Sequence, residues 1–343
     1  MERRQPISTQ SGESTSTASA IHFEDVTKRF SQTGRAAVDG VTLTVEPGQF
    51  VVLLGPSGCG KTTLLKMVNR LYETTSGRIL IDGEPVNGIP APALRRRIGY
   101  VIQQTGLFPH MRVADNIAVV PKLLGWERAQ ISARVDELLD LVGLPANEYR
   151  RRYPAQLSGG QQQRVGLARA LAASPTTMLM DEPFGALDAI TRTRLQGELK
   201  AIHRQLGQTI LFVTHDIEEA VRLADRIAVM RDGRVVQYDD PLRIVMHPAD
   251  GFVSDLVGAG DILRRLSLVP VRVAFEPADI PSAADLPAIG VDENLRTALA
   301  LLLEHQSRQL AVTDDAGHPI GTLDLAAIET AGIADEPAGI AAP

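Results

Sequence analysis

The chain has 343 residues, of which 44 % are hydrophobic and 22 % are charged, and its formal net charge is −6. This composition is that of a globular protein large enough for two domains, and the net negative charge argues against a general nucleic-acid binder. No apolar stretch approaches the ~20 residues that cross a bilayer, so any membrane role is expected to come through a partner. The single cysteine, Cys59, excludes an internal disulfide and fits a reducing cytoplasm.

Residues 1–20 are rich in Ser, Thr and Gln and predict a disordered tail. The predicted strands lie at 21–30, 37–45, 50–54, 78–82, 98–103, 177–180, 209–213, 226–230 and 235–238, and the predicted helices at 61–71, 128–142, 161–173 and 189–206. Between residues 112 and 155 the pattern is helical, which suggests a helical insertion between strands of one core.

After residue 260 the composition changes to Ala, Pro and Leu, without lysine. Residues 261–289 are interpreted as a linker, most clearly over 276–289. A helix at 293–305 and a strand at 309–312 then predict a small αβ unit within 290–343.

A glycine-rich stretch, GPSGCGKTT, lies between a predicted buried strand and a predicted helix. Its nine residues, Gly55, Pro56, Ser57, Gly58, Cys59, Gly60, Lys61, Thr62 and Thr63, are predicted to bind phosphate. The glycines let backbone N–H groups point inward at phosphate oxygens, and the helix adds the positive end of its dipole. Lys61 is expected to bridge the β- and γ-phosphates, and the Thr62 hydroxyl to ligate Mg²⁺. The alternative is a glycine-rich turn that fits the pattern by chance.

Cys59 lies inside this stretch, where backbone amides and the helix dipole should favour its thiolate form. We therefore expect a reactive thiol, provided that the sulfur is accessible.

A second stretch, LSGGQQQR at residues 157–164, places a serine and two glycines at a helix start. This predicts either an ordinary capped helix or a second anion site made of backbone amides. At this point the sequence resembles the ATP-binding subunits of ABC transporters, whose signature motif is LSGGQ. The resemblance implies that Ser158, Gly159, Gly160 and Gln161 of one subunit close on the γ-phosphate of the ATP held by another, so that the active unit is a homodimer; ATP and Mg²⁺ are the expected cofactors.

The resemblance also assigns catalytic roles to Glu182, His215, Lys61 and Gln103. Asp181 and Glu182 end a Walker B strand; Asp181 holds Mg²⁺ and Glu182 acts as the general base. His215 is the switch histidine that contacts the γ-phosphate. Gln103, or its neighbour Gln104, is the glutamine that touches Mg²⁺ and links the site to the membrane partner.

Two further nucleotide contacts follow from the same resemblance. Phe30 matches the aromatic residue that stacks on adenine, with a buried phenylalanine at a strand end as the alternative. Asp188 belongs to the loop at 185–188 that crosses the dimer interface.

The implied fold is an α/β P-loop NTPase core at 21–260, with an antiparallel β subdomain and a helical subdomain at about 104–168. Residues 290–343 resemble a single CBS module, which would serve as a regulatory segment. Asp324 stands where that module usually has Ser or Thr, so a plain structural αβ appendage remains the alternative.

The stretches 66–77, 98–111, 116–126 and 184–192 resemble importers of glycine betaine, choline, carnitine and proline-like osmoprotectants, with Ala189 in place of an expected proline. This implies an integral membrane permease, a separate solute-binding protein and a peripheral place on the cytoplasmic face of the inner membrane. One alternative is an importer of another small solute, such as an amino acid or polyamine. The other is a soluble ABC ATPase acting on ribosomes or DNA, which a single cassette without extended heptads does not favour.

Overall fold

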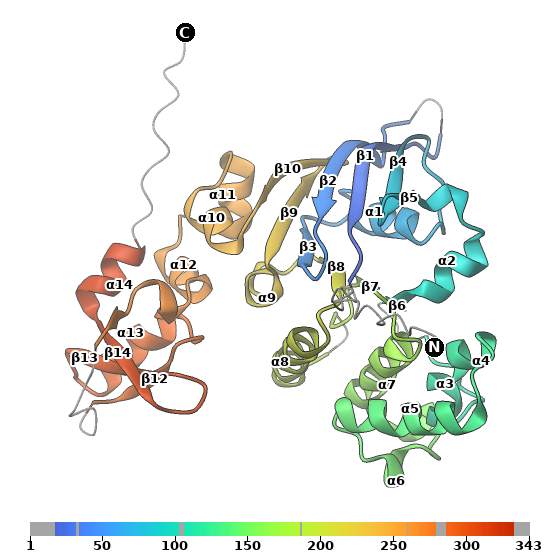
Figure 1. The fold of residues 1–343 in the computed structure, drawn as a ribbon. Helices are drawn as coiled ribbons and strands as arrows, with labels where there is room; N and C mark the ends of the chain where they lie inside the picture. The colour runs from blue at the N-terminus through green and yellow to red at the C-terminus, as the bar shows by residue number, and fades with distance from the viewer. Residues whose placement is uncertain are drawn as a thin grey trace, which may run out of the picture.

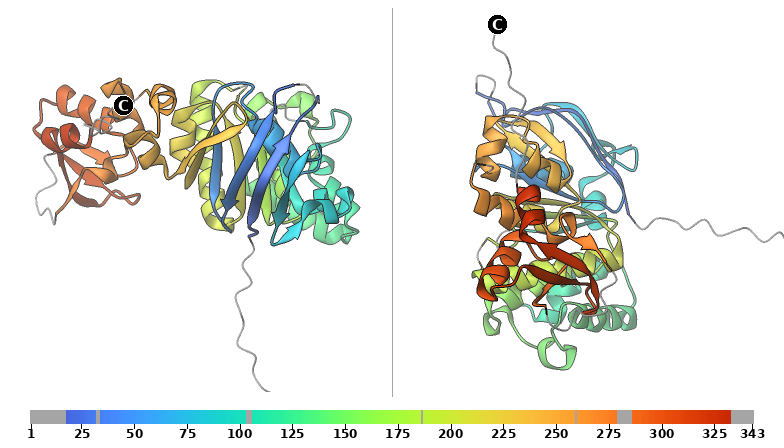
Figure 2. Two further views of the ribbon diagram at one scale, coloured as in Figure 1. Left: turned by 90° about the horizontal axis from the view of Figure 1, so that it is seen from above. Right: turned by 90° about the vertical axis from the view of Figure 1, so that its left-hand side faces the viewer.

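The computed structural model describes residues 18–31, 34–102, 106–185, 187–258, 260–278 and 286–332. A large body with two sheets occupies the chain up to residue 258, and a smaller unit follows it. The smaller unit and the helical part of the large body lie at opposite ends of the molecule (Figures 1 and 2).

The central sheet has six strands in the order β10-β9-β3-β8-β7-β6, all parallel except β10. Its strands are β3 (Phe50–Leu54), β6 (Ile98–Val101), β7 (Thr177–Asp181), β8 (Thr209–Thr214), β9 (Arg226–Arg231) and β10 (Arg234–Asp239). Every residue of β3 and β8 is buried, as expected for strands covered on both faces. The predicted hairpin at 226–238 is confirmed as β9 and β10.

A second, antiparallel sheet packs over one face of the central sheet. It is made of β2 (Val38–Val45), β1 (Ile21–Lys28), β4 (Ser76–Ile81) and β5 (Glu84–Pro85). Helix α1 (Lys61–Val68) lies between the sheets, and its Leu64, Leu65 and Val68 share a core with residues of both. A 3₁₀ turn, η1 (Val86–Gly88), and helix α2 (Ala91–Arg97) lead back to the central sheet.

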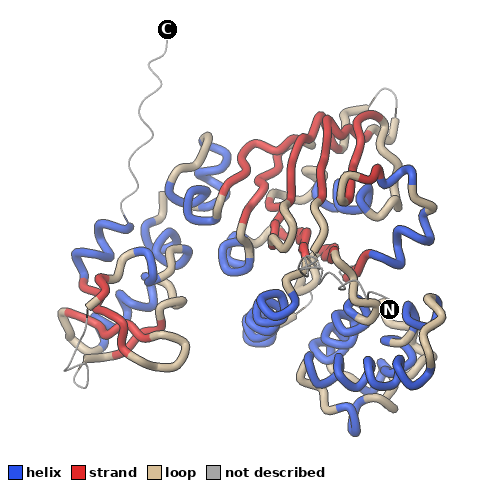
Figure 3. Tube along the Cα trace, in the orientation of Figure 1, coloured by secondary structure: helices blue, strands red, loops and turns tan. Residues whose placement is uncertain are grey.

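The opposite face of the central sheet is covered by helices. These include α8 (Ala189–Leu206), α9 (Ile217–Leu223), α10 (Pro241–Met246) and α11 (Gly251–Val257). Between β6 and β7 the chain forms the helical insertion seen in Figures 1 and 3. Its elements are α3 (Val113–Ile117), α4 (Val119–Leu123), α5 (Arg128–Leu141), α6 (Ala146–Tyr149), η2 (Pro154–Gln156) and α7 (Gly159–Leu171).

The smaller unit begins earlier than the sequence suggested. It contains α12 (Ile262–Leu268), η3 (Val271–Val273), β11 (Glu276–Pro277), β12 (Ala288–Gly290), α13 (Leu295–Glu304), β13 (Gln309–Thr313), β14 (Pro319–Asp324) and α14 (Leu325–Gly332). Helix α12 packs on α13 and α14, and β11 pairs with β14. The prediction of a linker over 261–289 is therefore wrong for 261–278, because Leu266, Leu268, Val269 and Val271 are buried and β11 pairs with β14. It is also wrong for 288–289, which begin β12. Residues 279–285 lie outside the described residues.

The N-terminal tail is also shorter than predicted. Residues 1–17 lie outside the described residues, but Ser19 is only 2 % exposed. Its hydroxyl donates to Thr176 Oγ1 over 2.6 Å, and its carbonyl accepts from the Thr209 hydroxyl over 2.6 Å. These bonds hold the chain just ahead of β1 against the amino ends of β7 and β8.

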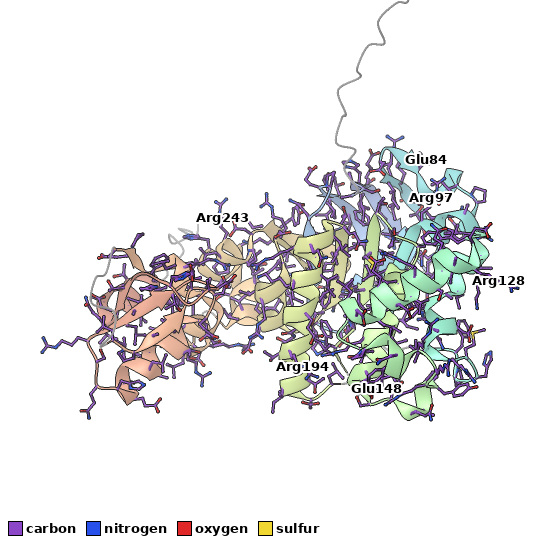
Figure 4. All side chains as sticks on the ribbon, turned by 60° about the horizontal axis from the view of Figure 1, so that its bottom comes forward. Glu84, Arg97, Arg128, Glu148, Arg194 and Arg243 are labelled. Carbon is purple, nitrogen blue, oxygen red and sulfur yellow. The ribbon has the colours of Figure 1, made fainter. Side chains whose placement is uncertain are left out.

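Charged side chains cover the outside of the molecule, as the surface pair Glu84 and Arg97 illustrates at 3.6 Å (Figure 4). Among the helices of the described residues, none combines the length and the apolar character needed to cross a bilayer.

Candidate functional site

The phosphate-binding stretch forms a tight loop between the end of β3 and the start of α1. Gly55 has φ 154°, and a Cβ there would lie 2.3 Å from the Met230 carbonyl oxygen. Gly60 has φ 110°, and its Cβ would lie 2.3 Å from the carbonyl oxygen of Ala37. Only glycine fits at both positions, because each is pressed against a neighbouring carbonyl group. The left-handed φ of Gly60 is a second reason at that position.

Lys61 brings a positive charge into the curve of this loop. Its side chain is buried, and Nζ donates to the carbonyl oxygens of Gly55 over 2.6 Å and Pro56 over 2.9 Å. A buried ammonium requires such partners, so the loop itself fixes where the charge sits. The arrangement suits a strongly anionic group bound against the loop.

Thr62 and Asp181 face each other beside the loop. The Thr62 hydroxyl donates to Asp181 Oδ1 over 2.7 Å. Burial raises the pKa of Asp181, while the Thr62 hydrogen bond and the charge of Lys66 act in the opposite direction. Burial and the Asp181 charge raise the pKa of nearby Tyr100 to about 12. Two hard oxygen groups at one point are the donors that Mg²⁺ prefers, so these residues fit the predicted ion.

Glu182 and His215 lie at the same sheet edge, because β7 and β8 run parallel and pair Asp181 with Val213. The Glu182 N–H donates to the Val213 carbonyl over 3.0 Å, and Glu182 Oε1 lies 3.4 Å from His215 Nδ1. Asp216 follows directly and caps α9, where its carboxylate accepts from the Glu218 N–H over 2.9 Å. The two predicted catalytic side chains are thus held together by the strands that precede them.

The signature stretch forms a capped helix start on the helical insertion. Ser158 caps α7: its hydroxyl accepts from the Gln161 N–H over 3.3 Å, and Gln161 Oε1 accepts from the Ser158 N–H over 3.0 Å. Ser158 and Gly159 are exposed. Within the described part of the chain, no hydrogen bond or ion pair joins Ser158–Gln161 to the phosphate loop. The helix start therefore presents its amides to solvent rather than to the loop of its own chain.

Phe30 is 61 % exposed, so the alternative of a buried strand-end phenylalanine is wrong. Its ring meets Tyr72 edge-on, with centroids 5.2 Å apart, and Lys28 Nζ lies 5.2 Å from the Phe30 centroid. With this exposure the ring remains accessible to a stacked ligand.

Comparisons with known proteins agree with this geometry. A family model described as ABC transporter matches residues 38–185. The chain is 47 % identical over 304 residues to the osmoprotectant import ATP-binding protein OsmV of Salmonella typhimurium, covering 88 % of this chain and 78 % of that protein. It is 49 % identical to the glycine betaine uptake system ATP-binding protein YehX of Escherichia coli, covering 88 % of this chain and 97 % of that one. The chain belongs to the ABC transporter family of ATP-binding subunits.

A solved relative places a nucleotide in the same fold. The ATP-binding cassette MJ0796, in a dimeric post-hydrolysis state with ADP and Pi, is 34 % identical, with a TM-score of 0.57. The match covers 64 % of this ABC subunit and 98 % of that chain.

Three predicted site residues remain to be placed. Asp188 is exposed and caps α8, where the Thr191 N–H donates to its carboxylate over 3.0 Å and lowers its pKa. Gln103 and its neighbour Gln104 lie outside the described residues.

Sequence reasoning missed two residues that hold the site of this ABC subunit. Asp216 could have been found, since an aspartate followed by two glutamates is a helix-start signal. Gln163 lies inside the quoted LSGGQQQR stretch, but its bond to Pro183, 20 residues away, leaves no local pattern.

The predicted reactivity of Cys59 is wrong in direction. The side chain is buried, and burial raises the pKa of its thiol in spite of the nearby Lys61 charge. Burial outweighs the amides and helix dipole on which the prediction relied.

Maleimide labelling of Cys59 should therefore be slower in the folded protein than in the urea-unfolded chain. Because the folded pKa is raised, the folded rate should keep rising at pH values where the unfolded rate has reached its plateau. Mass spectrometry of timed samples across a pH series measures both rates. A folded rate that levels off at a lower pH than the unfolded rate would contradict the raised pKa.

Proposed function

We propose that this chain hydrolyses ATP to drive a membrane importer for osmoprotectants of the glycine betaine, choline and carnitine type. The observation that carries the proposal is the convergence of the phosphate loop, Asp181, Glu182 and His215 at one sheet edge. The sequence match to ATP-binding proteins of osmoprotectant importers supports the transport role.

The roles of the side chains follow from their places. Lys61 and the loop amides hold the phosphates, while the Thr62 hydroxyl and Asp181 hold the cation. Mg²⁺, when bound, neutralises charge on the β- and γ-phosphate oxygens. Glu182 accepts a proton from the attacking water, and His215 Nδ1 lies 3.4 Å from that carboxylate.

The signature helix acts on the partner's nucleotide. Its start faces solvent, and the solved relative MJ0796 is a dimer in both of its described states. We infer a homodimer in which Ser158–Gln161 of each subunit complete the other subunit's site and Asp188 lines the interface. Exposed apolar side chains on the helical insertion, including Phe108 and Leu123, suit docking on a permease, with a separate binding protein supplying the solute. With such docking, we infer a peripheral location on the cytoplasmic face of the inner membrane.

Replacing the general base should separate binding from hydrolysis. Glu182→Gln is expected to bind ATP, form a stable ATP dimer and lose about 10²- to 10⁴-fold in kcat, because proton acceptance is lost while phosphate contacts stay. Lys61→Ala should instead weaken ATP binding by about ten- to hundredfold. Phosphate release and nucleotide titration measure these effects, and near-normal hydrolysis by Glu182→Gln would refute the assignment.

The solute class rests on how far the relatives match. Spermidine/putrescine import proteins named PotA are 45–48 % identical, but only over 71 % of this chain. Two other relatives each match across 90 % of this chain: the carnitine transport protein OpuCA of Listeria monocytogenes and the choline transport protein OpuBA of Bacillus subtilis. The additional similarity lies beyond the shared cassette, which favours the osmoprotectant class over the polyamine alternative.

A strain lacking the gene should lose uptake of one or more of betaine, choline, carnitine and proline under osmotic stress. Wild-type protein should restore uptake, and Lys61→Ala should not. Radiolabelled uptake with putrescine and amino acids as comparison solutes tests the class. Loss of putrescine or amino-acid uptake alone would overturn it. Co-purification distinguishes the importer subunit from the alternative of a soluble ABC ATPase that acts on ribosomes or DNA. A membrane permease, and not ribosomes, should purify with the subunit.

The C-terminal unit, which we infer to be a CBS-like regulatory segment, contacts the cassette away from the phosphate loop. Its helix α12 packs on α9, the helix that follows His215 and is capped by Asp216. Across the same contact, Arg204 of α8 lies 3.9 Å from Asp292, which also binds Arg272 over 2.5 Å. The unit is thus in a position to affect His215 through α9 without contacting the nucleotide.

Truncation should separate regulation from catalysis if the cut respects the observed boundary. A chain ending at residue 258 should keep ATP binding and maximal uptake in assembled transporters but change their response to a salt series. A chain ending at 288 keeps α12 and β11 without α13 and β14, so it should melt at a lower temperature and aggregate. Loss of nucleotide binding in a folded 1–258 chain would refute a regulatory role.

A further inference from the structure

The turn after β7 holds Glu182 in an unfavourable backbone conformation. Its φ is +44°, in the left-handed region that residues with a Cβ rarely adopt. Such a conformation persists only where surrounding bonds enforce it, and it is found most often at functional sites. The position of the Glu182 carboxylate therefore depends on whatever clamps this turn.

Among the described residues, these hydrogen bonds clamp it. Two come from the backbone nearby: the Glu182 N–H donates to the Val213 carbonyl over 3.0 Å, and the Gly185 N–H donates to the Glu182 carbonyl over 3.2 Å. The third comes from a side chain of the helical insertion, where Gln163 Nε2 donates to the Pro183 carbonyl over 2.5 Å. Because Pro183 follows Glu182 directly, this bond fixes the Pro183–Phe184 peptide group, one residue beyond the strained position.

Gln163 lies on α7, the helix whose first residues are the signature. The next residue, Arg164, anchors the helix to the core, with Nη2 donating to Glu198 Oε1 over 2.5 Å. Gly160 of the same helix sits so close to α8 that a Cβ would lie 2.9 Å from Thr191 Cγ2. The Gln163 bond therefore joins a firmly seated signature helix to the turn that carries the general base.

Packing alone does not account for a glutamine at this position. Its Nε2 is committed to Pro183, whereas its buried Oε1 has no hydrogen-bond partner among the described residues. The side chain borders a small cavity with mostly apolar walls, including Met180, Phe184 and Leu195. An apolar side chain of the same length would fill this space, so the feature that glutamine adds is the donated bond.

We propose that Gln163 is a positioning residue that holds the Glu182 turn in its left-handed form and couples it to the signature helix of the same subunit. A displacement of α7 as the signature closes on the partner's nucleotide is transmitted through this bond to Pro183. The position of Glu182 in each subunit is then linked to the contact between the signature helix of that subunit and the partner's nucleotide. The inference rests on the proposed role of Glu182 in hydrolysis.

Gln163→Met keeps the length of the side chain and removes the donor. It should lower kcat by about ten- to hundredfold, since misplacing a catalytic group by about 1 Å has effects of that size, while KM for ATP and ATP-driven dimerisation stay near wild type. Gln163→Ala, a smaller replacement, should likewise lower kcat while KM for ATP and dimerisation stay near wild type. The matched control is Gln208→Met, because Gln208 Nε2 also donates to a proline carbonyl, that of Pro175 over 2.8 Å, at the opposite end of β8. Gln208→Met should keep kcat.

A double-mutant cycle distinguishes positioning from general weakening. If Gln163 acts through Glu182, adding Gln163→Met to Glu182→Gln should cause no further loss in single-turnover hydrolysis. A further loss of the same size as in the wild-type background would overturn the proposal, as would unchanged kcat in Gln163→Met or an equal loss in Gln208→Met. Normal hydrolysis by Glu182→Gln alone would instead refute the assigned base and, with it, this inference.

Discussion

The parallel register of β3, β8 and β7 is the constraint on which the site depends. It pairs Leu54 with Thr214 and Val213 with Asp181, so that three strands end at one level. The loop after β3 supplies the phosphate cradle, the turn after β7 supplies the carboxylates, and the residue after β8 is His215. A slip of one residue in either pairing would exchange the side chains that pack on the two covered faces of the sheet and move these groups out of line, so the packing of the buried strands also fixes the site.

Three tight or strained backbone positions of this ABC subunit lie close to the ends of these strands. Gly55 and Gly60 are pressed against neighbouring carbonyls, and Glu182 adopts a left-handed φ. The left-handed φ of Glu182 lowers stability locally, and Gly55 and Glu182 each directly follow a strand that is buried along most or all of its length. The rigid sheet therefore tolerates a cradle and a turn that a looser scaffold would relax, and the geometry needed for phosphate chemistry survives.

The sequence was sufficient to predict features encoded in local patterns. The central strands are continuous apolar runs bounded by glycine or charge, the phosphate loop has fixed spacing, and Ser158 with Gln161 three residues later is a recognisable cap. It was insufficient where distant parts of the chain decide. The Gln163–Pro183 bond and the buried thiol of Cys59 depend on tertiary packing. The short helix α12 was hidden by the proline- and alanine-rich sequence that follows it.

The contact between the cassette and the C-terminal unit combines an apolar contact with a cluster of charged side chains. Helix α12 buries Leu266 and Leu268 and packs on α9, which supplies the apolar contact. Beside it, burial and the like charges of Arg204 and Arg272 lower the pKa of Lys200, and Asp292 is the carboxylate that pairs with both arginines. Crowded cations repel one another, and that repulsion weakens as mobile ions screen it. Because Asp216, the cap of α9, directly follows His215, a change in this charge balance would act on the element next to the proposed switch histidine while the apolar contact keeps the two parts together.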